Sequence, residues 1–246
     1  MMIACLVIGM QVFSQDVNTM LKGAQNFEKQ FKESEALDLY KKIVQADASN
    51  IDCLVKCTEL SCSIGARQTD GKLKNTYYLS AFDFAQKAIA VNGNSAAANY
   101  AMALASGKMT EVEDENKKLV AYVRQVKIYS DNALAIDPDN ARANYTAGKW
   151  HYEMTNLNWA KKAAVKTLYG GLPKASLDSA IYYMEKCCRL DVYFTPACLD
   201  LAKAYIDDDQ PGKAIEVLNK LVKLPNRAYN DAAIKAEGKK MLAELQ

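Results

Sequence analysis

Side chains that could carry out catalysis are scarce in this chain of 246 residues, and they do not form a recognisable set. The single histidine, His151, lies between Trp150 and Tyr152, which is typical of a packing or surface position. No serine or cysteine nucleophile is accompanied by an evident base that could activate it. The phosphate-binding patterns GxGxxG and GxxxxGK(S/T) do not occur either. We therefore predict that the protein is not an enzyme and binds no cofactor.

A metal site is not expected, although acidic residues and cysteines occur in groups. Asp207, Asp208 and Asp209 are consecutive, but a calcium loop would need a glycine and a distal glutamate at a fixed spacing after them. Such an acidic run is typical of a solvated turn that caps a helix. The cysteines contain no CxxC pair, and a second histidine is lacking, so zinc binding is not predicted.

We interpret the cysteines beyond the N-terminal segment as small apolar core residues. Their even number would permit disulfides in an exported protein. Cys53 and Cys57, however, fall on one helix face, where the Cβ atoms are too far apart for a relaxed bridge. Their oxidation state is left open. The six cysteines are Cys53, Cys57, Cys62, Cys187, Cys188 and Cys198.

The composition favours a helical protein that does not bind nucleic acid. Lysine and arginine number 31 and aspartate and glutamate 29, so the net charge of +2 provides no excess for many phosphate contacts. Half of the residues are hydrophobic, and 11 glycines and 5 prolines are too few for a turn-rich β architecture.

The N-terminus resembles a secretory signal peptide. Residues 1–10 form an uncharged apolar run, and Val12, Ser14 and Gln15 match a cleavage site with small residues at its key positions. The run is shorter than the roughly 20 residues that span a bilayer. We expect residues 1–14 to be removed and residues 15–246 to form one domain, secreted or periplasmic in a bacterium. Two alternatives stay open: an uncleaved segment that tethers the chain to a membrane, and a short buried helix.

Self-similar segments indicate a repeat protein. Ala98-Asn99-Tyr100 and Ala143-Asn144-Tyr145 lie 45 residues apart, and each follows a helix end and a polar turn. The pattern resembles the tetratricopeptide repeat, a pair of antiparallel helices of 34 residues. Small residues such as Ala202 and Ala214 would let the two helices of a repeat approach closely. The expected repeats are 17–50, 51–95, 96–140, 141–194 and 195–228.

The predicted fold is an all-α solenoid of about five helix pairs with two additions. The segment 229–246 places Ala233, Ile234, Met241 and Leu242 near one stripe, so we expect a helix that caps the last repeat. Repeats two, three and four exceed 34 residues, which predicts longer second helices and extended turns. Trp159 to Tyr169 in the fourth repeat predicts an extra amphipathic helix, which ends at Gly170-Gly171.

The fourth repeat also carries the most specific resemblance in the sequence. Gly148-Lys149-Trp150 with Tyr152 and Glu153, followed by Leu168-Tyr169-Gly170 and Pro173, is similar to motifs of the regulator of microtubule dynamics family and its bacterial relatives. The resemblance implies a helical adaptor without known catalysis. It implies microtubules only for eukaryotic members, because an exported bacterial chain would not meet tubulin. The insertion itself either stabilises the fourth repeat or forms a basic ledge, with Tyr169 and Lys174, for an acidic partner.

We expect a protein or peptide partner to bind along the concave groove that the first helices of the repeats line. Tyrosine offers contact area and a hydrogen bond, and lysine or arginine attracts carboxylates. The opposite expectation, that insertions fill the groove and stack on these residues, stays open. The groove candidates are Tyr100, Arg142, Tyr145, Lys149, Tyr152, Leu199 and Lys203.

The alternative function is structural, with the chain assembling through its own ends and insertions. Basic residues near the C-terminus would then face the acidic residues 207–209 of a neighbouring copy. Either way we expect a monomer or weak self-association, and contact with a membrane only through the N-terminal segment before cleavage. The basic residues are Lys220, Lys223, Arg227, Lys235, Lys239 and Lys240.

Overall fold

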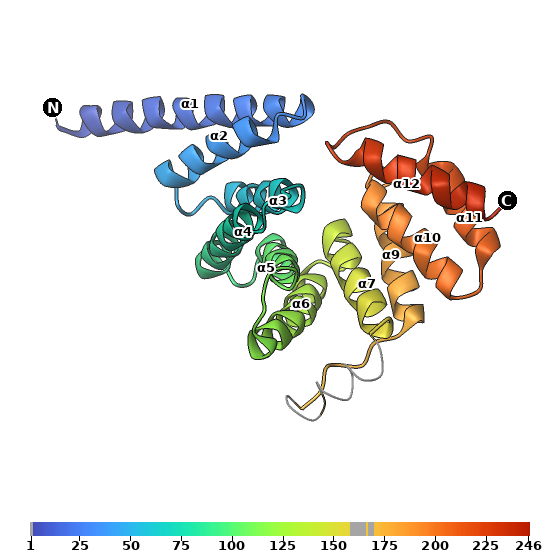
Figure 1. Cartoon of the computed structure of the whole chain (residues 1–246). Coiled ribbons are helices and arrows are strands. Elements are labelled where there is room, and N and C mark those ends of the chain that lie inside the picture. Colours follow the sequence, from blue (N-terminus) through green and yellow to red (C-terminus); the bar gives the residue numbers. More distant parts are fainter. Residues whose placement is uncertain (1, 158–165, 167–169) are drawn as a thin grey trace.

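The described part of the protein consists of helices, most of them joined by short turns, arranged as an arc (Figure 1). The structure, a computed structural model, describes residues 2–157, 166 and 170–246, and that part of the chain contains no strand. The helices are α1 (Met2–Lys29), α2 (Glu33–Ala46), α3 (Ile51–Ala66), α4 (Gly71–Val91), α5 (Ala96–Met109), α6 (Asn116–Ile136), α7 (Ala141–Thr155), α9 (Leu177–Leu190), α10 (Thr195–Asp207), α11 (Pro211–Leu221) and α12 (Asp231–Glu244).

Consecutive helices pack in pairs, and each pair packs on the next. The pairs are α1 with α2, α3 with α4, α5 with α6, α7 with α9, and α10 with α11. The second helix of each pair then packs against the first helix of the following pair. Because each pair contacts mainly its neighbours, the hydrophobic core runs along the stack and does not converge on one centre. The predicted all-α solenoid of five helix pairs is confirmed.

Short capped turns separate one pair from the next. Asn50 accepts a hydrogen bond from the backbone N–H of Cys53 at 3.0 Å and so caps α3. Asn140 accepts one from the N–H of Ala143 at 2.9 Å and caps α7. These side chains satisfy N–H groups that the helix itself leaves without partners. These caps therefore fix where the first helices α3 and α7 begin.

The extra residues of the second and third repeats are absorbed by helix. The second helices α4 and α6 contain 21 residues each, whereas α2 contains 14. An insertion is readily accommodated as helix because each added residue makes its own backbone hydrogen bond. The connections inside these repeats, residues 67–70 and 110–115, stay short.

The two predicted additions have different outcomes. The extra helix expected at Trp159 to Tyr169 falls outside the described residues. The capping helix is present as α12, which packs on α10 and α11. Its inner stripe differs from the predicted one, because Ala233 is exposed and Gly238 takes the central position. The partly buried residues of α12 that join the C-terminal core are Ile234, Met241 and Leu242.

Small residues allow two particularly close helix crossings. A Cβ atom on Gly148 of α7 would lie 2.8 Å from Cγ of Met184 and 3.0 Å from the carbonyl oxygen of Ala180, both on α9. A Cβ atom on Gly238 of α12 would lie 2.9 Å from Cδ2 of Leu221. Glycine is required at the Gly148 crossing, because backbone atoms of α9 lie close to it, whereas at Gly238 the nearest atom is the end of the Leu221 side chain, which can shift.

Among the residues that the structure describes, a side-chain pair joins the N-terminal part of the arc to the C-terminal part. The guanidinium carbon of Arg67, which follows α3, lies 4.2 Å from the ring centroid of Tyr229, just before α12. Arg67 is also held by an ion pair with Glu33. We call the Arg67–Tyr229 pair the clasp.

Asp231 fixes the segment that carries Tyr229. Its carboxylate is 2% exposed and accepts hydrogen bonds from the backbone N–H groups of Arg227, at 2.6 Å, and Ala228, at 2.7 Å. The hydroxyl of Thr195 donates to the same carboxylate at 2.6 Å. A buried carboxylate is tolerated here because three donors surround it. The segment before α12 is thereby anchored to the start of α10.

Candidate functional site

The Ala-Asn-Tyr motif explains how the third and fourth repeats are built. The side-chain amide of Asn99 donates to the carbonyl oxygens of Gly93, at 2.7 Å, and Ser95, at 2.9 Å. Asn144 repeats this arrangement with Pro138, at 2.9 Å, and Asn140, at 2.8 Å. Both amides are 1% exposed. The asparagine of the motif therefore secures the turn before its helix, and its role is structural.

The tyrosines of the same motif reach acidic residues on neighbouring first helices. The hydroxyl of Tyr145 on α7 donates to Asp200 Oδ2 on α10 at 2.8 Å. The hydroxyl of Tyr100 on α5 donates to Glu59 Oε1 on α3 at 3.0 Å. Burial, followed by the nearby carboxylate, raises the pKa of both tyrosines well above the ordinary value. Both hydroxyls therefore stay protonated and act as donors.

Asp200 is the centre of the polar surface that the first helices form in the C-terminal repeats. Besides the bond from Tyr145, it accepts one from Lys149 Nζ at 3.1 Å, and Lys203 Nζ lies 3.8 Å from its other oxygen. Lys149 also lies 3.3 Å from Glu153. Burial alone would lower the pKa of Lys149, but Asp200 and Glu153 outweigh it, and the pKa is raised. The strip of α7 and α10 that these residues form is called the Asp200 strip below.

A matching network joins the first helices of the N-terminal repeats. Lys56 of α3 lies 3.1 Å from Glu28 of α1 and 3.3 Å from Glu59, which in turn accepts the bond from Tyr100. Acidic and basic groups thus alternate from α1 to α5. The inner surface is polar on both sides of the arc, but its charges are paired with one another.

The remaining predicted groove residues are also engaged within the chain. Arg142 lies 3.1 Å from Asp191 and stacks on the ring of Phe194 at 3.5 Å. The hydroxyl of Tyr152 donates to Asp207 at 2.8 Å. Leu199 is 5% exposed and belongs to the C-terminal core, so it offers no surface to a partner.

The structure therefore brings together part of the predicted strip and accounts for its charges. Tyr145, Lys149 and Lys203 meet at Asp200, and Lys203 also pairs with Glu237 of α12 at 2.8 Å. These residues therefore do not form a strip of unpaired cations that would attract carboxylates. Sequence reasoning missed Asp200, whose signal was its spacing of three residues before Lys203 on one helix face.

A cavity of about 160 Å³ adjoins the Asp200 strip between α5, α6 and α7. Its walls are mostly apolar and include Leu104 and Gly107 of α5, Val126 of α6 and Trp150 of α7. Tyr145 and Lys149 also line it, so the cavity and the strip share two residues. Two lysine–carboxylate pairs, Lys108 with Glu111 and Lys149 with Glu153, provide its polar lining. We call this space the α5–α7 cavity.

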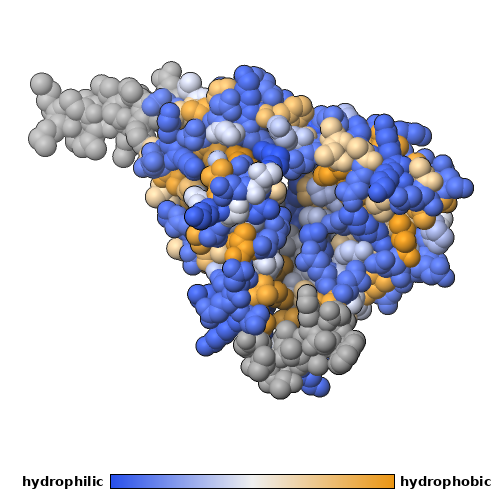
Figure 2. Space-filling model, viewed as in Figure 1, coloured by the Kyte–Doolittle hydropathy of each residue, from blue (hydrophilic) through white to orange (hydrophobic). Residues whose placement is uncertain are grey.

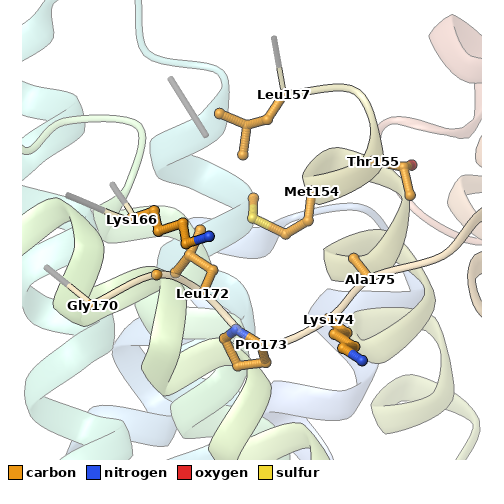
Figure 3. Close-up of a pocket in the computed structure, with 10 residues that line it drawn as sticks. Met154, Thr155, Leu157, Lys166, Gly170, Leu172, Pro173, Lys174 and Ala175 are labelled. Carbon is orange, nitrogen blue, oxygen red and sulfur yellow. The ribbon is translucent and has the colours of Figure 1, made fainter. Parts of the chain in front are cut away.

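A larger hollow of about 600 Å³ lies where α7 ends and the chain returns to α9 (Figure 3). Met154 and Leu172 point into it, and Lys166 lies beside it. The α5–α7 cavity is the better candidate site because helices form most of its wall and it contains two of the predicted groove residues.

The N-terminal and C-terminal repeats are separated by a cleft in the space-filling view, and hydrophilic residues cover most of the surface around this cleft (Figure 2).

The motif that carried the family resemblance proves to be structural in its described part. Gly148 provides the close crossing with α9, and the indole N–H of Trp150 donates to the carbonyl oxygen of Val123 at 2.9 Å. Gly170 and Gly171 have φ angles of 74° and 89°, a conformation that favours glycine. Arg124 of α6 donates to the carbonyl oxygen of Gly171 at 2.7 Å. The motif thus fixes α7 against α6 and α9.

His151 has a packing role. It is 7% exposed, stacks on Tyr183 at 5.9 Å between ring centroids, and its Nδ1 accepts a long hydrogen bond of 3.4 Å from the N–H of Ser176. Ser176 caps α9, so the histidine helps to place the start of that helix. Across the described residues, no cluster of three or more His, Cys, Asp or Glu side chains is arranged to hold a metal ion. No helix in that part of the chain has the length and hydropathy needed to cross a membrane.

The stacked helix pairs, the capped turns and the terminal helix define a protein of the tetratricopeptide-repeat class. A thermophilic TPR protein of Thermus thermophilus superimposes with a TM-score of 0.67, at 11% identity, over 92% of this chain and 99% of that one. The sequence pattern that describes the regulator of microtubule dynamics proteins 1–3 matches residues 20–246. The chain belongs to the regulator of microtubule dynamics family.

Individual relatives are distant and mostly longer. Regulator of microtubule dynamics protein 1 of Caenorhabditis elegans is 29% identical over 118 residues, which cover 48% of this chain and 52% of the relative. The protein 1 of Mus musculus is 24% identical over 219 residues, covering 87% of this chain and 71% of the relative. Protein 3 of Rattus norvegicus is matched over only 35% of its length. The chain thus spans about half or less of the length of the first relatives it matches.

Proposed function

We propose that this protein is a non-enzymatic scaffold that binds a segment of another protein along the first helices of its repeats. An apolar side chain of that segment occupies the α5–α7 cavity, and the segment continues over the Asp200 strip. The observation that carries the proposal is the position of this apolar cavity directly beside Tyr145 and Lys149. The tetratricopeptide-repeat class, whose members commonly present a concave binding surface, supports it.

The size and lining of the cavity favour a single side chain over a small-molecule ligand. Pockets for small molecules commonly measure about 300–1,000 Å³, whereas the α5–α7 cavity measures about 160 Å³. One large aliphatic or aromatic residue is the usual anchor of a protein interface, and it binds in a desolvated pocket. The paired charges at Lys108 and Lys149 favour a segment of low net charge around that anchor.

Gly107 provides a test because its Cα borders the cavity without contributing a polar group. A Cβ atom there would lie 3.7 Å from Val126, an ordinary contact, so Gly107→Ala is tolerated. Gly107→Leu fills the cavity and leaves every ion pair of the strip intact. We expect selection from a random peptide library on the purified protein to enrich segments that share one large apolar residue. The Gly107→Ala protein should bind them and the Gly107→Leu protein should lose them by at least tenfold.

Two results would reject the binding site. One is a library that yields no shared motif with the unmodified protein. The other is equal binding by the Gly107→Ala and Gly107→Leu proteins, provided that both show the same circular dichroism spectrum as the parent.

Tubulin is a specific candidate because the matched relatives are named regulators of microtubule dynamics. We favour a different partner, because an exported chain would not encounter tubulin. Co-sedimentation of the purified protein with assembled microtubules distinguishes the two: we expect it to remain in the supernatant. Sedimentation that Gly107→Leu abolishes would place tubulin at the proposed site instead.

Export is part of the proposal, with residues 1–14 acting as a signal peptide. The apolar run and the small residues at Val12 and Ser14 support it, and the family match begins only at residue 20. N-terminal sequencing of the protein purified from its native cell should begin at Gln15. A chain that retains residues 1–14 would reject cleavage and favour an attached segment.

A further inference from the structure

We propose that Cys188 and Cys198 form a disulfide bond between α9 and α10 when the protein meets a small-molecule or protein disulfide. Their Sγ atoms lie 3.6 Å apart as free thiols. A disulfide requires about 2.0 Å between the sulfur atoms. The two helices already pack together, so the sulfurs need to move closer by only about 1.6 Å.

The two thiols differ in the properties that thiol–disulfide exchange uses. Cys188 is partly exposed and Cys198 is nearly buried. One thiol donates to the other across the 3.6 Å contact, and either sulfur can be the donor. Cys188 is thus the thiol that an external disulfide can reach, and Cys198 lies beside it as the thiol that can complete the exchange.

The exchange proceeds in two balanced steps. The thiol of Cys188 loses its proton to solvent and attacks a disulfide RSSR, which forms a mixed disulfide and releases one RS⁻. The thiol of Cys198 then loses its proton to solvent, and the resulting thiolate attacks Sγ of Cys188 and releases the second RS⁻. Both leaving thiolates take up protons from solvent. Overall the two cysteine thiols are oxidised and RSSR is reduced to two RSH.

The other cysteines beyond the N-terminal segment are poorly suited to the same reaction. Cys53, Cys57 and Cys62 are at most 3% exposed, so an external disulfide does not reach their sulfur atoms. Cys187 is adjacent to Cys188 but is fully buried. Reaction is therefore directed to one pair.

The bond would affect the proposed binding surface because Cys198 precedes Asp200 by two residues on α10. Linking α9 to α10 fixes the helix that carries Asp200 relative to the pair α7 and α9. It also closes a short loop, which should raise the thermal midpoint of unfolding by about 5 °C.

The test treats the folded, full-length protein with oxidised glutathione and analyses it by intact mass and peptide mapping. We expect the loss of two hydrogens, a cross-link between the peptides that contain Cys188 and Cys198, and a higher thermal midpoint that dithiothreitol reverses. Cys198→Ser should trap one glutathione on Cys188, because the second step is then blocked. Cys187→Ser is the matched control and should form the cross-link normally.

Three outcomes would overturn the inference. The folded protein could retain all its thiols under conditions that oxidise it in urea. The cross-link could involve Cys187 or a cysteine of α3. Cys198→Ser could fail to accumulate the adduct while Cys187→Ser still forms the cross-link. The mapping of the unmodified protein decides the matter even if a serine variant does not fold.

Discussion

At the scale of single residues, Asn99 and Asn144 show how a repeated motif translates into a repeated contact. Each buried amide donates to two carbonyl oxygens of the turn that precedes its helix. Replacement by alanine removes both hydrogen bonds. Each hydrogen bond contributes about 0.5–1.5 kcal/mol to stability.

We therefore expect Asn99→Ala and Asn144→Ala each to lower the free energy of unfolding by about 2 kcal/mol. Urea denaturation followed by circular dichroism measures the change. Asn94→Ala, at an exposed position of the turn before α5, is the control and should stay within about 0.5 kcal/mol of the parent. Equal losses of unfolding free energy in Asn94→Ala and Asn99→Ala would show that the buried amide hydrogen bonds do not contribute more than an exposed asparagine does.

His151 should make stability depend on pH below neutrality. Burial, and then the charge of Lys127, lowers its pKa below 6.5, while Asp131 acts in the opposite direction. The folded state thus favours the neutral ring, whose Nδ1 accepts from Ser176. The stabilising contribution is complete above the unfolded-state pKa of about 6.5 and is lost as the pH falls from that value through the lower pKa of the folded state.

The comparison that isolates this effect is His151→Asn, which removes the titrating group and keeps an acceptor. Between pH 7.5 and pH 5, the urea midpoint of the parent should fall more steeply than that of the variant. Trp150, Tyr183 and Ser176 face the ring, and Lys127 forms an ion pair with Asp131. Parallel pH profiles would exclude His151 as the cause.

The groove shows how far residue types alone can predict a site. Tyr145 and Lys149 do lie on the surface shared by the first helices, as their spacing of four residues on one helix predicted. The same pattern could not reveal that Asp200, 51 residues beyond Lys149, neutralises the lysine. Leu199 was assigned to the groove although it is buried, because an error of one residue in helical phase rotates a side chain by about 100°.

At the scale of helices, Gly148 and Gly107 occupy similar sequence contexts but differ in the space available for a side chain. A Cβ atom on Gly148 would lie within 3.1 Å of the backbone nitrogen of Met184 and within 3.0 Å of a carbonyl oxygen. Backbone atoms cannot move aside without shifting α9. A Cβ atom on Gly107 would meet only a side-chain methyl group at 3.7 Å.

Gly148→Ala should therefore destabilise the protein by about 2 kcal/mol, the usual cost of overpacking. Gly107→Ala should be neutral or stabilise it by up to about 1 kcal/mol, because alanine is the better helix former. Urea unfolding of the two variants side by side provides the measurement. A stable Gly148→Ala protein would mean that α7 and α9 can separate at little cost.

The helices themselves were largely predictable, and their lengths less so. Polar turns such as residues 137–140 determine the start of a repeat locally, through caps that a sequence displays. How an insertion is divided between helix and turn depends on packing against the neighbouring pair. For the same reason the stripe of α12 was misplaced at Ala233, since the packing of α12 on α11 turns Gly238 toward Leu221.

At the scale of the whole molecule, repeat number and order follow from the sequence, but the contact between the two ends of the arc does not. Arg67 and Tyr229 are 162 residues apart, and neither belongs to a repeat signature. Their meeting depends on the accumulated rotation of the intervening helix pairs. Small errors in each pair would separate them, so the clasp could emerge only from the complete structure.

A double-mutant cycle tests the clasp. Arg67→Ala, Tyr229→Ala and the double variant should reveal a coupling free energy of about 0.5–1 kcal/mol, as expected for an exposed cation–π pair. The cycle separates this contact from the ion pair of Arg67 with Glu33. Arg67→Ala combined with Tyr182→Ala on α9 is the control and should be additive. Additivity in both cycles would show that the ends do not touch in solution.

The clasp also bears on how the molecule responds to mechanical force. An open stack of helix pairs lengthens gradually and elastically under tension, because each pair contacts only its neighbours. Here a pull on the ends first loads the stacking of Arg67 on Tyr229 and, behind it, the anchorage of Asp231. Extension would then begin with a sudden increase in length when the Arg67–Tyr229 contact breaks. After that step the protein would lengthen gradually, as an open stack does.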